Sequence, residues 1–388
     1  MAFIYLDAAS TTPPFKEVLD IVYSVSKTKW FNSSSTHFGG ISSSEILEKS
    51  RFDIARKFKT QHHNVVFTSG ASESIMIALN NLSLNFKPQS ICTSTVEHQS
   101  TYIALERLKR VGWNIDYWPV SINGIVDFSR IEQNLKKETK ILSLIWGQSE
   151  IGSIQPINKI GSICKQLGII FHVDGTQILS NGIFDWNKIN CDLLSLSAHK
   201  FGGPKGIGLL LLKDNVLDLL QDINISPLHE NQIRQGTQSV ALIAGMSKAL
   251  ENRNDYITLK ENNIIFPNNI AKKVINKVKE ELSAIKAITF TGDPINRLPN
   301  NLSFIIKNYK NKPISSDKII NYFSDRDIAI SSGSACSSFS IDTSVLKSIQ
   351  IDNIFRKSHL RISSGYWNRL SDTDNIANLL NNCIELFD

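Results

Sequence analysis

The residues best suited to chemistry lie where a short apolar run ends, in Ser195-Leu196-Ser197-Ala198-His199-Lys200-Phe201-Gly202-Gly203-Pro204. The run from Asp192 to Leu196 predicts a buried strand, and the two glycines and the proline predict a turn just after Lys200. A lysine that is desolvated at a strand end can attack an aldehyde and form a Schiff base. A solvated loop lysine would fit the same stretch, so other parts of the sequence must decide between the two interpretations.

A second strand ends on an acid. Residues 168–174 read Gly-Ile-Ile-Phe-His-Val-Asp, and Gly175-Thr176-Gln177 follow. Asp174 would therefore lie at the carboxyl edge of a parallel sheet, where open α/β folds bind ligands. The separation from Lys200 is long enough for one crossover to a strand of the same sheet. A buried aspartate needs a cationic partner, and a pyridinium nitrogen would be one.

A third strand leads into a possible anion site. Val65-Val66-Phe67 predicts a strand, Thr68 to Glu73 a turn of small residues, and Ser74 to Leu82 a helix. Free N–H groups and the helix dipole favour a phosphate at such a turn, although an ordinary capped helix start is the simpler alternative. A phosphate site, an acid for a ring nitrogen and an amine for an aldehyde together describe pyridoxal 5′-phosphate (PLP).

A cysteine in a run of small residues forms a possible second centre, Ile330-Ser331-Ser332-Gly333-Ser334-Ala335-Cys336-Ser337-Ser338. A thiol attacks as the thiolate, so this loop must bring Cys336 to a place that lowers its pKa or takes its proton. An inert core cysteine is the common alternative. Downstream, Arg361 lies in a strand-like context and is suited to a carboxylate, either from a substrate or from a structural ion pair. His98, just past the strand from Ile91 to Val96, could stack on a planar ring or be structural.

The order of the elements predicts an α/β protein. Strands and helices alternate up to about residue 257, which indicates a parallel sheet with helices on both faces. Within it we expect a helix from Ser44 to Phe58, whose apolar residues have helical spacing. Beyond it we expect a long helix from Asp255 to Leu282, interrupted near Pro267, and then an α+β region with a strand from Asn301 to Ile306. We expect the N-terminal strand, Phe3 to Leu6, to join this smaller region.

Composition limits the class of protein. The chain has 388 residues, 41% of them hydrophobic and 20% charged, with a net charge of +6 spread along the sequence, so neither nucleic-acid binding nor a membrane span is expected. Its five cysteines include no CxxC pair, which argues against a disulfide framework, a zinc site or another metal centre. The N-terminus does not resemble a signal peptide. We therefore expect a cytoplasmic location.

Together these residues resemble the PLP-dependent cysteine desulfurases of the NifS/IscS type, from Tyr5-Leu6-Asp7 to Arg361. The resemblance implies the type I fold of PLP-dependent transferases, with a mostly parallel seven-stranded sheet in a large domain, residues 14–257. Residues 1–13 and 258–388 would form a smaller domain that carries the catalytic cysteine loop. The most specific motifs are Phe67-Thr68-Ser69-Gly70-Ala71-Ser72-Glu73-Ser74, His172-Val173-Asp174-Gly175-Thr176-Gln177, Ser197-Ala198-His199-Lys200 and Ser331-Ser332-Gly333-Ser334-Ala335-Cys336-Ser337-Ser338.

The resemblance also implies roles for individual residues. Lys200 would form the internal aldimine and shuttle protons, His98 would stack on the ring, and Cys336 would take the sulfur of L-cysteine as a persulfide while alanine leaves. Asp174 would bind the pyridinium nitrogen of the cofactor, and Gln177 would bind its phenolic oxygen. The phosphate would be bound by Ala71, Ser72, Ser197, His199 and, from the other subunit of a homodimer, Thr237. Arg361 would hold the substrate carboxylate, with Asn32 and Ser149 nearby.

The sequence departs from the usual family pattern at three places. Ser149 replaces the usual asparagine, the opening stretch reads Asp7-Ala8-Ala9-Ser10 instead of Asp-Asn-Ala-Ala, and Ser33 replaces the usual proline after Asn32. None of these changes removes a group essential for the chemistry. They suggest a specialised branch of the family, in which either the position of the substrate near Ser149 is altered or Gln148 compensates for the shorter serine.

The sulfur acceptor is left open by these residues. An iron–sulfur scaffold, a tRNA thiolation enzyme and a DNA phosphorothioation system all draw on such enzymes, and a partner protein would handle any nucleic acid. The alternatives to a desulfurase are another enzyme of the same fold, such as an aminotransferase or a β-lyase, and an inactive scaffold that only binds a partner.

Overall fold

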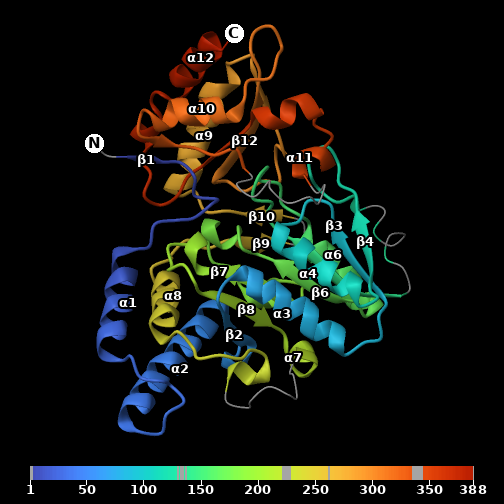
Figure 1. Cartoon of the computed structure of the whole chain (residues 1–388), viewed down its shortest axis with the longest axis vertical. Helices are drawn as coiled ribbons and strands as arrows, with labels where there is room; N and C mark the ends of the chain where they lie inside the picture. The colour runs from blue at the N-terminus through green and yellow to red at the C-terminus, as the bar shows by residue number, and fades with distance from the viewer. Residues whose placement is uncertain are drawn as a thin grey trace.

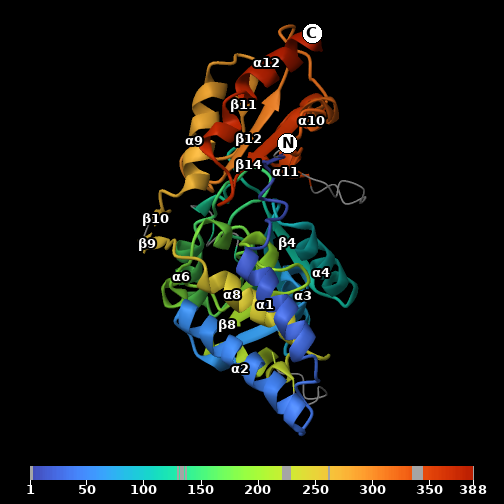
Figure 2. The same ribbon diagram turned by 90° about the vertical axis from the view of Figure 1, so that its left-hand side faces the viewer.

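The structure is a computed structural model that describes residues 3–128, 131, 135, 138–220, 229–260, 263–333 and 344–387. Two layered units lie one above the other (Figures 1 and 2). The lower unit is built on a large sheet, and the upper unit contains α9 (Ile270–Ser283), α10 (Ser316–Ser324) and α12 (Ile376–Leu386). We retain the boundaries at residues 13/14 and 257/258 as our proposal for the two domains.

The large sheet has seven strands in the order β2-β8-β7-β6-β5-β3-β4. The strands are β2 (Val65–Thr68), β3 (Ser90–Ser94), β4 (Asn114–Trp118), β5 (Thr139–Ile145), β6 (Ile170–Asp174), β7 (Leu193–Ser197) and β8 (Gly208–Leu212). Neighbours from β4 to β7 run parallel, and β8 is antiparallel to both β7 and β2. The prediction of a mostly parallel seven-stranded sheet is therefore confirmed.

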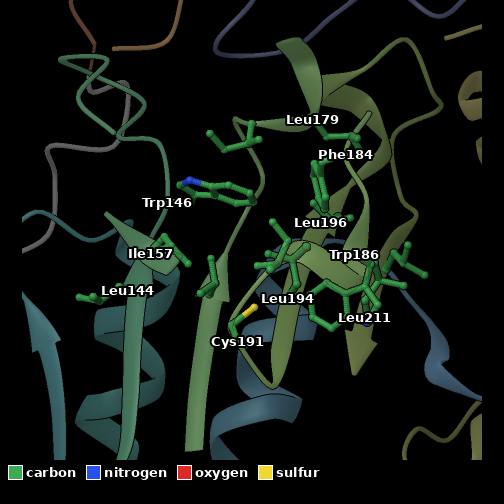
Figure 3. Packing of buried hydrophobic residues seen from close by; sticks show 14 of the residues in the cluster. Leu144, Trp146, Ile157, Leu179, Phe184, Trp186, Cys191, Leu194, Leu196 and Leu211 are labelled. Atoms are coloured by element: carbon green, nitrogen blue, oxygen red, sulfur yellow. The ribbon is translucent and has the colours of Figure 1, made fainter. Parts of the chain in front are cut away.

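Both faces of the sheet are covered, because successive side chains of each strand point to opposite sides. Leu193 and Leu210 pack with α3 (Ala71–Leu84), α4 (Gln99–Arg110) and α7 (Asp214–Leu220). Leu194 and Leu211 pack on the other face with α2 (Phe38–Phe58), α6 (Ile157–Leu167) and α8 (Val240–Glu251). Figure 3 shows the second layer, where Leu194, Leu196 and Leu211 lie beside Phe184 and Trp186. Each of these leucines is at most 1% exposed, and its burial contributes roughly 1.5–3 kcal/mol.

The described helices vary from one turn to more than five turns. They are α1 (Lys16–Thr28), α2 (Phe38–Phe58), α3 (Ala71–Leu84), α4 (Gln99–Arg110), α6 (Ile157–Leu167), α7 (Asp214–Leu220), α8 (Val240–Glu251), α9 (Ile270–Ser283), α10 (Ser316–Ser324), α11 (Val345–Ser348) and α12 (Ile376–Leu386). None of the described helices is long and apolar enough to cross a membrane.

The upper unit has its own core around a three-stranded antiparallel sheet, β11 (Ile288–Phe290), β12 (Asn301–Ile306) and β14 (His359–Ser363). Apolar residues of α9, α10 and α12 pack against it. The N-terminal strand β1 (Ile4–Tyr5) pairs with β13 (Ile328–Ala329), and Asp7 bridges to Ser363. The N-terminus thus joins this unit, as the sequence predicts, before the chain crosses to the large sheet.

The predicted helix from Asp255 to Leu282 is wrong in its first half. Residues Thr258–Lys260 (β9) and Asn263–Ile265 (β10) form an antiparallel pair, and α9 begins only after Asn269, whose side chain accepts a hydrogen bond from the N–H of Lys272. Just before β9, the N–H of Ile257 binds the carbonyl of Ile183, 2.7 Å away, which holds the backbone extended. This tertiary contact, which local sequence does not reveal, overrides the helical spacing.

Candidate active site

Lys200 lies directly after β7, at the end of a short helical turn from Ala198 to Lys200. Its Nζ donates to the carbonyl oxygens of Ala9 (2.6 Å) and Ser10 (2.8 Å), which the N-terminal segment brings from the other unit. Burial, and next the positive charge of Arg361, lower the pKa of Lys200 to about 8. A substantial fraction of the amine is therefore neutral near physiological pH, as a nucleophile requires.

Asp174 ends β6, the strand beside β7, and is 4% exposed. Its Oδ1 accepts from both the N–H (3.0 Å) and the hydroxyl of Thr176, which fix the carboxyl group. Nearby Glu97 is also buried; its burial raises its pKa to about 8, with a smaller contribution from the charge of Asp174. Glu97 is therefore mostly protonated at pH 7.

His98 caps α4, the helix after β3. Its Nδ1 accepts from the N–H of Ser100 (3.2 Å) and lies 2.7 Å from the Ser100 hydroxyl, so the ring is held at the strand end. The ring is exposed to the cavity described below, but the walls of the cavity shield it from bulk water. This desolvation lowers the pKa of His98 because it disfavours the charged imidazolium. A neutral, oriented ring of this kind is suited to stacking on a planar ligand.

The turn before α3 provides backbone donors for an anion. Gly70 precedes the helix and supplies no side-chain cap, so the first N–H groups of α3, beginning at Ala71, have no acceptor among the described residues. A Cβ on Gly208 of β8 would lie 2.5 Å from the Gly70 backbone, so only glycine lets the strand approach this turn. A Cβ on Gly70 would in turn lie 3.8 Å from the Ser197 hydroxyl, so strand β7 supplies a further donor on the same side.

Arg361 lies on β14 and is 2% exposed. Its Nη2 donates to Oδ1 of Asp7 (2.7 Å) and to the hydroxyl of Ser10 (2.8 Å). Its Nη1 donates to the carbonyl oxygens of Ser149 (3.0 Å) and Gly333 (3.3 Å). Arg361 thus joins the N-terminal segment, the turn after β5 and the start of the cysteine motif in one place.

These groups converge on one cavity of about 1090 Å³. The predicted site residues that line it are Ala71, Ser72, His98, Ser149, Asp174, Gln177, Ser197, His199, Lys200 and Arg361. Asn32 and Thr237 do not line it; Ser33, beside Asn32, bonds to Gln238, beside Thr237, so both lie in one separate region. Cys336 lies outside the described residues.

The sequence analysis missed four residues that hold the site together: Asp7, Ser10, Glu97 and Thr176. Asp7 and Ser10 act through the pairing of β1 with β13, which no local pattern reveals. Thr176 could have been found, because a threonine two residues after an acidic strand end commonly bonds back to that acid. Glu97 directly precedes His98 at a strand end, but nothing in the sequence distinguishes it from an exposed acid.

The donor set of this cavity fits PLP. Asp174 offers an anion for a ring nitrogen, His98 a face for the ring, and the α3 N-terminus with Ser197 a set of donors for the phosphate. Lys200 offers an amine with a lowered pKa for the aldehyde. No described group of three or more His, Cys, Asp or Glu side chains is arranged to hold a metal ion.

Comparison with known proteins agrees with this geometry. The sequence matches the family described as Aminotransferase class-V over residues 4–376. It is 32% identical to a cysteine desulfurase IscS of Dictyoglomus turgidum, covering 98% of this chain and 94% of the relative. It is 31% identical to a cysteine desulfurase IscS of Neisseria meningitidis, covering 93% and 87%.

Solved structures give the same fold. A NifS-like protein superposes with a TM-score of 0.84 at 25% identity, over 100% of this chain and 99% of that one. A structure of SspA in complex with cysteine superposes with a TM-score of 0.78 at 26% identity, over 94% and 100%. The chain is therefore a member of the class-V aminotransferase family, a PLP-enzyme family, and within it a cysteine desulfurase of the IscS/NifS type.

Proposed function

We propose that this protein converts L-cysteine to L-alanine and keeps the sulfur as a persulfide on Cys336, from which an acceptor protein takes it. The observation that carries this proposal is the convergence of Lys200, Asp174 and Arg361 on one cavity. Gly333 and Ser344, the described residues on either side of the segment that contains Cys336, also line that cavity.

Different residues of the cavity would bind different parts of the cofactor. Asp174 would hold the ring nitrogen, His98 the ring face and Gln177 the phenolic oxygen, while Lys200 would bind the aldehyde. The phosphate would be held by Ala71, Ser72, Ser197, His199 and, from the other subunit of a homodimer, Thr237. When bound, PLP supplies an electron sink for the charge that develops on the amino acid.

Arg361 binds the substrate carboxylate, and Ser149 lies beside Arg361. Asn32, which does not line the cavity of its own chain, also contributes to substrate binding. Lys200 moves the proton between the carbons of the substrate, for which its pKa of about 8 is well matched to neutral pH. The thiolate of Cys336 attacks the substrate sulfur. The bond between that sulfur and its carbon breaks and an S–S bond forms, so alanine and a persulfide account for every atom.

The placement of Asn32 and Thr237 supports a homodimer. They lie beside an aromatic cluster in which the rings of Trp30 and Phe31 are 4.3 Å apart and those of Phe31 and Phe38 are 5.9 Å apart. Trp30 is 72% and Phe38 82% exposed, which is typical of a surface that another chain covers. A second copy bound there would bring its own Thr237 loop towards this chain's cavity.

The proposal is tested by measuring alanine and sulfide from L-cysteine, with a thiol reductant present, for the wild type and Cys336→Ala. We expect equal amounts of both products from the wild type and neither from the variant. Undiminished turnover in Cys336→Ala would instead favour a β-lyase or an aminotransferase, neither of which needs this thiol.

A further inference from the structure

Arg361 is nearly saturated by acceptors of the protein itself. A guanidinium has five N–H donors, and the four on Nη1 and Nη2 already meet four acceptors: Asp7, Ser10, Ser149 and Gly333. The fifth, on Nε, is buried and has no partner among the described residues. A substrate carboxylate that binds Arg361 must therefore share these donors with acceptors of the protein, so a further donor beside the arginine would stabilise it.

Ser10 is the one side-chain acceptor of Arg361 that also lines the cavity; Asp7 does not. The hydroxyl of Ser10 accepts from Nη2 at 2.8 Å, so its own O–H remains to donate, and no described residue accepts from it. Unlike the buried guanidinium, Ser10 is exposed to the cavity. Accepting from a cation also makes a hydroxyl a stronger donor, because hydrogen bonds in a chain polarise one another.

Ser10 also lies between the two groups that an amino acid must meet. Its carbonyl oxygen accepts from Nζ of Lys200 at 2.8 Å, and its hydroxyl accepts from Arg361. An α-amino acid carries its amino group and its carboxylate on one carbon, so both must bind close together. The residue that connects Lys200 to Arg361 is therefore placed beside the substrate carboxylate.

We propose that the Ser10 hydroxyl, polarised by Arg361, donates a hydrogen bond to the α-carboxylate of the amino-acid substrate. This assignment rests on the proposed function of the cavity and adds a specificity-determining residue to it. The backbone carbonyl of Ser149 accepts from the other terminal nitrogen, Nη1, of the same arginine.

The test compares two ligands that differ only by the carboxylate, L-alanine and ethylamine. Each is titrated into the PLP-loaded protein, with the visible absorbance of the cofactor as the readout. We expect Ser10→Ala to weaken the binding of L-alanine about tenfold, which corresponds to about 1.4 kcal/mol. The binding of ethylamine should be unchanged. Ser10→Thr keeps the hydroxyl and should retain most of the affinity for L-alanine.

Ser162→Ala is the matched control, because it removes an exposed hydroxyl on α6 outside the cavity, and it should alter neither titration. With L-cysteine, Ser10→Ala should raise KM by the same factor as the loss of L-alanine affinity, with kcat nearly unchanged. Unchanged or tighter L-alanine binding in Ser10→Ala, or equal weakening of both ligands, overturns the assignment. Failure of the proposed function itself is distinct, because the wild type would then release no alanine from L-cysteine.

Discussion

Lys200 has a reactive amine because of what surrounds it, and each contribution is visible in the structure. Burial removes water from the ammonium form, and the positive charge of Arg361 disfavours it further, while Asp174 and Asp7 act in the opposite direction. The carbonyl oxygens of Ala9 and Ser10 hold the amine in place. The pKa of about 8 is the balance of these effects.

The pH dependence of cofactor capture follows from this balance. The neutral amine is the reactive form, and its fraction rises as pH increases through about 8. We expect the rate at which the cofactor-free protein captures PLP to rise with a midpoint near this pH. Arg361→Gln should move the midpoint upward, since it removes a charge that lowers the pKa. A wild-type midpoint near the ordinary lysine value of about 10.4 would contradict this assignment.

The reactive groups at the strand ends were predictable from the sequence. The long-range contacts that hold these groups together were not. Asp174 and Lys200 each end an apolar run, and parallel strands place such ends at one edge. The contacts of Arg361 with Asp7 and Ser10 join residues more than three hundred positions apart. They depend on the pairing of β1 with β13 and on the bridge from Asp7 to Ser363 of β14, which local periodicity does not encode.

Residues 229–238, the loop that carries Thr237, are held in an unusual conformation. Glu230, Asn231 and Gln232 have φ values of 43°, 55° and 66°, a left-handed run that costs about 1–2 kcal/mol per residue. Arg51 of α2 offsets this cost with two bonds of 2.9 Å to Glu230, and the N–H of Phe67 donates to the same carboxylate at 2.8 Å. The loop is thus anchored to the strand that precedes the phosphate turn.

Breaking this anchor should be costly. The Glu230 side chain is fully buried and that of Arg51 is 8% exposed, so Glu230→Gln removes the buried counter-charge of Arg51 and leaves it only the more exposed Glu48, whose Oε2 lies 3.2 Å from Nε. We expect the free energy of unfolding to fall by about 3–5 kcal/mol, measured as a lower midpoint in urea. Lys49→Gln, which breaks the exposed pair of α2 with Asp53, should cost less than about 1 kcal/mol. Equal effects of the two substitutions would refute the anchoring role.

Helices and strands were predictable from the sequence where a single local pattern determines the structure. Residues 301–306 form the expected strand, β12, whereas the expected helix from Ser44 to Phe58 begins six residues earlier, at Phe38. Gly39 and Gly40 disfavour a helix on propensity. They are needed there because a Cβ on Gly40 would lie 2.1 Å from the Ser35 carbonyl oxygen. Tertiary packing therefore selects residues that local preference rejects.

At the scale of the whole molecule, the exposed aromatic cluster of Trp30, Phe31 and Phe38 predicts the assembly state. We expect the wild type to sediment as two chains and Phe38→Asp, which puts a charge into the proposed interface, as one. Because Thr237 would then no longer reach a partner, the variant should also bind PLP more weakly. A wild type that sediments as a single chain would contradict the shared site.

The central claim is that Cys336 receives the sulfur, and the most direct measurement is the mass of its peptide after reaction with L-cysteine in the absence of reductant. We predict that this peptide gains one sulfur atom while alanine is released. Peptides with the buried Cys92, Cys164, Cys191 and Cys383 should remain unmodified. Alanine or pyruvate released with no sulfur on Cys336 would contradict the account.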